Sequence, residues 1–482
     1  MKKRIVSLTL AAAMTVACTP VILAGCGGGE AIDYEHTIVF YSSQGDNLQK
    51  KTKVAIDNFQ AKYPGWKVEH TPQGGYDEVK EKISTDLQGE GGGLQPDLAY
   101  CYPDHVAQYL QTEQVIDMNK YIYSTDVVTG VDESGAEKQY VVGYSENELK
   151  DFTPTFWKEG LAPNYSGYEK YHYADDAMLS LPFVKSTEAL YYNADALAAC
   201  KYEDGTALKP ATTWDELWEQ APIIRKQFPS ATVLGYDSEA NWFINMCQQN
   251  DWGYTSVKED KHYLFNENNA DLKSWLGTLK TRYTDGWITT QAAYGSYTST
   301  LFTNGPEKGG IVYCIGSTGG ASYQQPKPNT FTAGVAPVPG SVQEDGTVVK
   351  SVISQGPSLV MFNAGHGVSN AEEKAKMTFL FIKELLDPTF QMSFSMESGY
   401  NPCRESVYDN KIYQDFLNKE DSVISAACKV ARDSRENFFV SPAFIGSSTA
   451  RTQVGNVVLY CMKGQRTADT ALNIAYKNCG GK

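Results

Sequence analysis

The sequence predicts an α/β protein built as two lobes. Residues 37–41 are rich in β-forming side chains, a helical pattern with apolar residues on one face follows until Pro64, and residues 66–71 have the pattern of a second strand. Strand, helix and strand in succession are typical of a parallel sheet. Because 482 residues exceed what one hydrophobic core usually organises, we expect two lobes.

The later elements continue this alternation of strands and helices. Residues 95–103 predict a strand that ends at polar and aromatic residues, and Thr213 with Glu216 has the capping-box spacing of a helix start. A second helical pattern ends at Pro388. Residues 121–176 instead mix tyrosine, glycine and acidic residues with few periodic apolar positions, so we expect an irregular insertion there.

The N-terminus has the three parts of a secretory signal peptide. Basic residues occupy positions 2–4, an apolar run follows, and small residues stand directly before Cys26, which predicts a signal over residues 1–25. No later segment offers the run of about 18 apolar residues that a membrane-spanning helix needs. We therefore expect an exported chain that does not itself span a bilayer.

The residues around Cys26 indicate how such a chain would stay at the cell surface. Cys26 directly follows Leu23, Ala24 and Gly25, an order that resembles the lipobox of bacterial lipoproteins. The resemblance implies that Cys26 is acylated and becomes the first residue of the mature chain. Residues 26–36 then predict a glycine-rich tether that spans roughly 18 Å. The expected location is the extracellular face of the cell membrane, with the protein anchored by its lipid.

Composition narrows the class of partner. The formal net charge is −15, and it becomes −18 without residues 1–25, because that segment holds two lysines, one arginine and no acid. Such an acidic chain disfavours nucleic acid as a partner, since phosphate binding is driven by clustered Lys and Arg. The 31 tyrosines and 8 tryptophans suit polar, ring-shaped ligands, because tyrosine combines an apolar ring with a hydrogen-bonding tip.

Eight cysteines remain once the signal and Cys26 are set aside. Their even number in an exported chain is compatible with disulfides, but their wide spacing fixes no pairing, so disulfides and buried free thiols both stay open. No CxxC motif supports a zinc site or a thioredoxin-like site. These cysteines are Cys101, Cys200, Cys247, Cys314, Cys403, Cys428, Cys461 and Cys479.

The sequence lacks the local motifs of common hydrolases. HExxH, GxSxG and GxxxxGK[ST] do not occur. We therefore expect no catalytic residue, no metal and no cofactor. A glycosidase needs only two carboxylates that are close in space, which spacing along the chain does not reveal. A surface-anchored glycoside hydrolase or lyase stays as an alternative class, and an adhesin with an exposed aromatic patch is a third.

Six segments, in order, resemble the extracellular solute-binding proteins (family 1) of bacterial carbohydrate ABC importers. The resemblance runs from about Thr37 to the C-terminal helices, and residues 121–176 fit it least. It implies a periplasmic-binding-protein-like α/β fold, in which crossing strands join two lobes and the ligand lies in the cleft between them. The segments are IVFYSSQG, QPDLAYCYPDHVAQYLQTEQVIDMNKYI, LPFVKSTEALYYNADAL, TTWDELWEQA, GGIVYCIGSTGG and ESGYNPCRESVY.

The resemblance also implies lobe boundaries and a function. Residues 37–184 and 315–358 would form one lobe, and residues 185–314 and 359–482 the other. The chain would be a monomeric binding protein rather than an enzyme. It would capture a small-molecule carbohydrate or related polyol by hinge closure and deliver it to the permease subunits of an ABC importer.

Several positions most resemble the glycerol-3-phosphate-binding branch of that family. An arginine fork, hydroxyls and backbone NH groups can hold a phosphate, so glycerol-3-phosphate or a glycerophosphodiester is the alternative ligand. The positions that fall where similar proteins place ligand contacts are Tyr76, Ser186, Ser317, Gly356, Tyr400 and Arg451.

Further candidate contacts come from strand ends and from tryptophans. Ligands of open α/β sheets lie beyond the carboxyl ends of strands, and Trp242 and Trp252 stand in a region where many relatives place rings that pack on a sugar's apolar face. The candidates at predicted strand ends are Tyr41, Ser43, Gln44, Tyr102 and Thr318, the last beside Ser317.

Overall fold

The computed structural model describes residues 32–89, 95–258, 261–363, 367–419 and 421–481. The chain from Tyr34 onward forms one compact unit. The predicted signal peptide, the predicted lipidation site Cys26 and the tether up to residue 31 lie outside the described residues. Within the described ranges, no helix is both long enough and apolar enough to cross a membrane.

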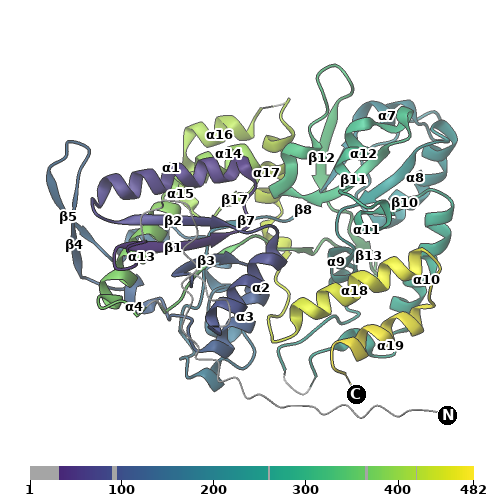
Figure 1. Cartoon of the computed structure of the whole chain (residues 1–482). Helices are drawn as coiled ribbons and strands as arrows, with labels where there is room; N and C mark the ends of the chain where they lie inside the picture. Colours follow the sequence, from purple (N-terminus) through teal and green to yellow (C-terminus); the bar gives the residue numbers. More distant parts are fainter. Residues whose placement is uncertain (1–31, 90–94, 259–260, 364–366, 420, 482) are drawn as a thin grey trace, which may run out of the picture. The chain divides into compact units, whose positions relative to one another are not determined.

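The first sheet organises one half of this unit, which we call the first lobe (Figure 1). Its interior strand β1 is buried along its whole length and pairs in parallel with β2 and β3, as a continuous apolar run in a covered sheet should. Helices α1 (Asp46–Lys62) and α13 (Ala371–Leu385) pack on this sheet and on each other. The ring of Phe59 on α1 meets the ring of Phe381 on α13 edge to face. The strand order is β2 (Lys67–Pro72), β1 (Thr37–Ser42), β3 (Leu98–Cys101), β16 (Ser358–Met361) and β6 (Leu181–Pro182).

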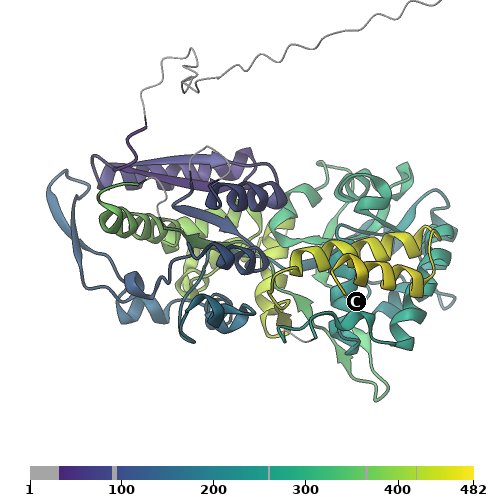
Figure 2. The same cartoon turned by 60° about the horizontal axis from the view of Figure 1, so that its bottom comes forward.

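The second sheet organises the second lobe. Strand β9 is parallel to β10 and β11, whereas β8 is antiparallel to β11 and β12. The helices α9 (Glu239–Asn250), α10 (Ala270–Thr284), α18 (Ser447–Met462) and α19 (Ala468–Asn478) pack together on this lobe, and Figure 2 shows α18 and α19 in yellow along it. The strand order is β10 (Ile288–Thr290), β9 (Thr232–Tyr236), β11 (Ile311–Ser317), β8 (Glu188–Asn193) and β12 (Ala333–Pro337).

Two neighbouring crossing segments join the lobes, and the chain crosses once more between α13 and α18. The first runs from β6 through β7 (Val184–Lys185) into β8, and the second from β15 (Val352–Ile353) into β16. They pair through Ser186 and Gln355, whose backbone NH groups donate to each other's carbonyl oxygens at 2.8 and 2.7 Å. Gly356 has φ 107°, and a Cβ there would lie 2.4 Å from the carbonyl oxygen of Val184, so only glycine fits this crossing.

The strand registers place the carboxyl ends of both sheets at these crossings. The end of β11 pairs with the start of β8 at Ser317 and Glu188, and the end of β3 pairs with the start of β16 at Cys101 and Ser358. The loops that follow the parallel strands of each sheet therefore face the region between the lobes, which is where α/β sheets bind ligands.

The structure confirms the predicted α/β class and corrects the predicted lobe boundaries in the second half of the chain. Segment 315–358 was assigned to the first lobe, but β11 and β12 belong to the second sheet. Segment 359–482 was assigned to the second lobe, but most of β16 and all of α13 lie in the first. The chain returns to the first sheet only at β16, which inserts beside β3.

Residues 121–176 are more regular than predicted. They contain an antiparallel hairpin of β4 (Val127–Val131) and β5 (Glu137–Val141), visible at the left of Figure 1. Asp132 shapes its turn by accepting hydrogen bonds from the backbone NH groups of Ser134 and Ala136. Because most side chains of this hairpin are exposed or half-buried, the apolar alternation that signals a half-buried strand is weak.

The described cysteines outside the signal region are all free thiols, so the alternative of disulfides among them is not realised. Seven are buried and Cys479 is half-buried.

The remaining helices and strands are α2 (Tyr76–Leu87), α3 (Pro103–Tyr109), α4 (Asn119–Ile122), α5 (Glu146–Lys150), α6 (Pro154–Lys158), α7 (Ala194–Ala199), α8 (Trp214–Gln227), α11 (Gln291–Tyr294), α12 (Ser299–Asn304), α14 (Pro388–Ser398), α15 (Glu405–Asp409), α16 (Lys411–Leu417), α17 (Val423–Asp433), β13 (Ser341–Val342), β14 (Val348–Val349), β17 (Asn401–Pro402) and β18 (Phe438–Phe439).

His70 on β2 makes the first lobe sensitive to acid. Its imidazole stacks on Phe40 and bonds Ser42 at 2.7 Å, and burial lowers its pKa to about 4. In the unfolded chain His70 takes up a proton near pH 6.5, whereas in the folded chain it does so only near pH 4. The free energy of unfolding therefore falls as the pH drops from about 6.5 to about 4, because the unfolded chain binds the proton more readily. Allowing for partial exposure, we expect a loss of about 1–2 kcal/mol.

Thermal melting between pH 7.5 and 4.5 tests this expectation. His70→Gln keeps a partner for Ser42 but removes the titration, so it should flatten the pH dependence. An unchanged slope in the His70 variant would contradict the assignment.

Candidate functional site

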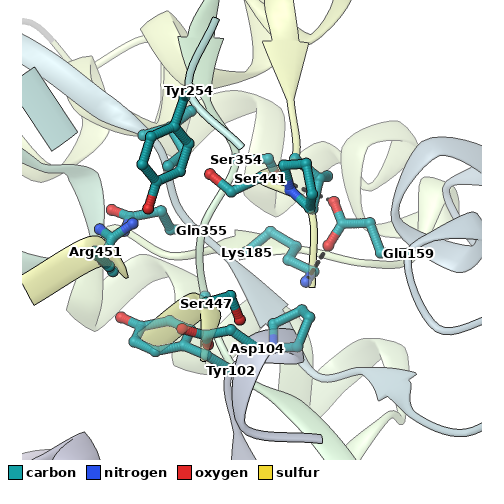
Figure 3. A pocket seen from close by; sticks show the side chains of 15 residues that line it. Tyr102, Asp104, Glu159, Lys185, Tyr254, Ser354, Gln355, Ser441, Ser447 and Arg451 are labelled. Atoms are coloured by element: carbon teal, nitrogen blue, oxygen red, sulfur yellow. Dashed lines mark hydrogen bonds and ion pairs between the residues drawn. The ribbon is translucent and has the colours of Figure 1, made fainter. Parts of the chain in front are cut away.

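A cavity of about 60 Å³ lies where the carboxyl ends of both sheets meet the crossing segments (Figure 3). Both lobes contribute to its wall. Arg451, Gln355 and Tyr254 group at one side, and Lys185 with Glu159 stands at the other. The lining residues are Tyr102, Pro103, Asp104, Glu159, Lys185, Tyr254, Ile353, Ser354, Gln355, Gly356, Val440, Ser441, Pro442, Ser447 and Arg451.

Lys185 and Glu159 form a buried ion pair at one side of the cavity. Their side chains are 1% and 4% exposed. Lys185 stands on β7 in the first crossing segment, and Glu159 follows α6. Glu159 also accepts a hydrogen bond from the Ser354 hydroxyl at 3.0 Å, so the pair ties both crossing segments to the first lobe. Charges this deeply buried are stable only when paired.

Arg451 belongs to a polar network at the other side. It lies in the second turn of α18 and donates to Oδ1 of Asn241 on α9. The Asn241 amide in turn donates to Oε1 of Glu188 at 2.7 Å and to Oε1 of Gln355 at 2.9 Å. Burial raises the pKa of Glu188 to about 7, although hydrogen bonds from Tyr236 and Asn241 oppose this shift. The network holds Arg451 against both crossing segments.

Tyrosines form the wall of the site on the first lobe. Tyr102 follows β3 and stacks on Tyr76, with ring centroids 4.0 Å apart, and Tyr76 meets Tyr100 edge to face at 5.9 Å. Burial, together with the neighbouring hydroxyls of Tyr100, Tyr102 and Tyr400, holds the pKa of Tyr76 well above its usual value. The ring of Tyr400 lies against Gly319, where a Cβ would come within 2.6 Å of it.

Several buried polar atoms have no partner within the described part of the chain. Among them is the buried hydroxyl oxygen of Ser441, in the cavity wall. Buried hydroxyls without partners are costly. Such atoms are what a polar ligand would satisfy. Across the described residues, no group of three or more His, Cys, Asp and Glu could hold a metal ion.

The structure brings part of the predicted ligand set together. Tyr102, Gly356 and Arg451 line the cavity, and Tyr76 stacks directly behind Tyr102. Tyr400 adjoins Tyr76. Ser43 lies beside Tyr100, and Ser186 pairs with Gln355 of the lining.

Other predicted residues have structural roles instead. Ser317 caps the 3₁₀ segment Thr318–Gln324 by accepting from Gly319 NH at 3.2 Å, and the Thr318 hydroxyl accepts from Thr187 NH. The hydroxyl of Tyr41 donates to Asp86 at 2.9 Å, with the side chain 2% exposed. These side chains therefore stabilise loops and the core, and they do not line the cavity.

Trp242 and Gln44 also have structural roles, and Trp252 is half-buried. Trp242 is 0% exposed and stacks between Tyr236 and Trp214 in the core of the second lobe, so it is no platform for a ligand. Trp252 packs on Trp275 of the same core. Gln44 is buried and accepts from the Thr52 hydroxyl of α1 at 2.6 Å. An aromatic next to other apolar residues, as in NWFIN, signals core more often than surface.

Sequence reasoning missed most of the polar lining. Lys185 stands next to the predicted Ser186, and its charge within an otherwise apolar strand region was a usable signal. Glu159, Asp104, Tyr254 and Ser441 come from loops whose spacing gives no periodic signal, so only the fold reveals them.

Comparisons of the sequence with known proteins agree on one class, the bacterial solute-binding proteins. A family model described as bacterial extracellular solute-binding protein matches residues 54–419. The sn-glycerol-3-phosphate-binding periplasmic proteins UgpB of Brucella abortus (strain 2308) and Brucella suis biovar 1 (strain 1330) are each 25% identical over 293 residues, or 55% of this chain. The match spans 57% of the length of these curated relatives.

Solved structures share the two-lobe fold. UgpB from Mycobacterium tuberculosis in complex with glycerophosphocholine has a TM-score of 0.69 at 16% identity, covering 92% of this chain and 97% of that one. Maltose-bound MalE3 of T. maritima has a TM-score of 0.66 at 16% identity, with 92% and 99% covered. The GacH receptor of Streptomyces glaucescens, solved without ligand and with acarbose, has a TM-score of 0.65 at 16% identity and the same coverage.

Proposed function

The chain belongs to the bacterial extracellular solute-binding proteins, and from that membership we propose that it is the substrate-binding component of an ABC importer for a neutral carbohydrate or related polyol. The family consists of binding proteins, which confirms the prediction that the chain is not an enzyme. The observation that carries the ligand class is the cavity between the lobes, where the rings of Tyr102 and Tyr254 stand together with the unpartnered hydroxyl of Ser441. Sugars need both partners, because their CH faces pack on rings and their hydroxyls need hydrogen bonds.

Ligand capture requires the lobes to separate and close. A cavity of about 60 Å³ is far below the roughly 300–1,000 Å³ of small-molecule sites, so a sugar enters only when the cleft widens. Lys80 on α2 donates to the hydroxyl of Ser448 on α18 at 3.0 Å, a direct contact between the lobes. A ligand that touches both lobes binds the closed form better than the open form, and this differential affinity drives closure. The closed form would then dock on the permease subunits.

A glycerophosphodiester is the second candidate ligand. Arg451 and Lys185 both line the cavity and could hold a phosphate by charge-assisted hydrogen bonds. The curated relatives are named for glycerol-3-phosphate.

A thermal-shift screen separates the candidates. The purified protein is melted with mono- to hexasaccharides of glucose, xylose and mannose, and with glycerol-3-phosphate and glycerophosphocholine. We expect a saturable rise in melting temperature with one saccharide series. A rise with the phosphate compounds alone would replace the carbohydrate with the second candidate, and shortening of a sugar during incubation would indicate a glycosidase.

We also propose that Cys26 anchors the protein by a lipid on the outer face of the cell membrane. Cys26→Ser should move the protein from the membrane fraction to the soluble fraction, because a transmembrane span is not predicted elsewhere in the chain. Cys18→Ser is the matched control, since that cysteine leaves with the predicted signal and its change should leave the protein in the membrane fraction. Retention of the Cys26 variant in membranes would refute the anchor.

A further inference from the structure

Two exposed tyrosines stand on loops at the cleft edge of the second sheet. Tyr297 lies between α11 and α12, after β10, and is 60% exposed. Tyr323 lies in the 3₁₀ segment after β11 and is 73% exposed. Both loops therefore follow the carboxyl ends of parallel strands, at the edge that faces the first lobe.

One half-buried carboxylate holds both loops. Asp237, at the end of β9, accepts hydrogen bonds through Oδ1 from the backbone NH and hydroxyl of Thr298, at 2.6 and 2.7 Å. Its Oδ2 accepts from the Gln324 amide at 3.5 Å. These partners are the immediate neighbours of Tyr297 and Tyr323. The exposed rings thus stand on anchored backbone, which lowers the entropy cost of binding a ligand there.

Both loops adjoin the tyrosine wall of the cavity at Tyr400. From Tyr102 the wall runs through Tyr76 to Tyr400, whose ring lies against Gly319 in the same segment as Tyr323. Tyr297 is close enough to contribute to the raised pKa of Tyr400. The loops that carry the two exposed tyrosines are therefore next to the buried tyrosine wall.

The two segments that carry Tyr297 and Tyr323 are uncharged. Residues 289–305 and 309–326 contain no Asp, Glu, Lys or Arg, although these make up 21% of the chain. Ser, Thr, Gln and Asn supply hydrogen-bonding groups instead. A surface of neutral polar groups and tyrosine rings matches a neutral chain of sugar rings and offers no counter-charge to a phosphate.

We propose that Tyr297 and Tyr323 form an outer subsite that packs on the sugar rings of a neutral oligosaccharide whose first unit occupies the cavity. The inference rests on the proposed carbohydrate-binding function and narrows it to an oligosaccharide longer than the cavity can enclose.

Titration calorimetry with matched short and long sugars tests the subsite. The probes are maltose and maltohexaose, xylobiose and xylohexaose, and mannobiose and mannohexaose. In the series that binds, we expect the hexasaccharide to bind about tenfold more tightly than the disaccharide. The double variant Tyr297→Ser/Tyr323→Ser should remove that gain and leave the disaccharide affinity within about twofold.

Tyr123→Ser is the matched control, because Tyr123 is 62% exposed but lies beside α4, away from the second sheet. It should change neither affinity. Equal affinity of the wild type for both lengths, or an equal loss for both in the double variant, would overturn the outer subsite while the binding function stands. Binding of glycerophosphocholine alone would overturn the subsite and the carbohydrate assignment together.

Discussion

Lys185→Met is expected to lower the free energy of unfolding by about 3–5 kcal/mol, because it leaves the Glu159 carboxylate buried without its cation. Both side chains are less than 5% exposed, so water cannot replace the lost partner. The double variant Lys185→Met/Glu159→Gln should recover much of the loss, since it removes both charges together. Urea unfolding of the three proteins measures these differences.

An exposed ion pair is the control for this result. Lys53 and Asp57 on α1 are 69% and 53% exposed, so Lys53→Met should cost less than about 1 kcal/mol. A Lys185→Met protein that is as stable as the Lys53→Met protein would show that the pair does not hold the crossing segments together.

Arg451→Ala is expected to weaken ligand binding by an amount that depends on the ligand class. A hydrogen bond from the guanidinium to a sugar hydroxyl accounts for a loss of about tenfold. Pairing with a phosphodiester would account for a loss of about a hundredfold or more, because the phosphate charge would be left without its partner. The carbohydrate assignment therefore predicts the smaller loss, measured by titration calorimetry.

Arg451→Lys separates charge from geometry. It keeps the positive charge but loses the planar fork, so it should restore phosphate binding in part and sugar binding hardly at all. Because Arg451 also donates to Asn241, circular dichroism and melting should first establish that both variants fold. Unchanged affinity for every ligand in Arg451→Ala would remove Arg451 from the site.

The sequence predicted those parts of the fold that depend on local pattern. The strand at residues 37–41 appears as β1 over Thr37–Ser42, and the predicted cap at Thr213 is real, since its hydroxyl accepts from Glu216 NH at 3.2 Å. The family resemblance gave the two-lobe fold. The lobe boundaries failed because membership of a sheet depends on long-range pairing, as when β16 inserts beside β3.

The site was predictable only where a residue follows a strand or lies at a crossing. Tyr102 and Gly356 satisfy this condition and line the cavity. Trp242 failed because a tryptophan on a helix has the same sequence pattern whether its ring faces the core or a ligand, and here three aromatic neighbours enclose it. Glu159 was missed because the fold brings its loop to Lys185, 26 residues away in the chain.

Titration calorimetry of the purified protein with the saccharide panel tests the central claim most directly. We predict saturable one-to-one binding of one neutral saccharide series, with the sugar recovered at its original length. Absence of binding heat across the whole panel, or recovery of shortened sugar, would contradict the account.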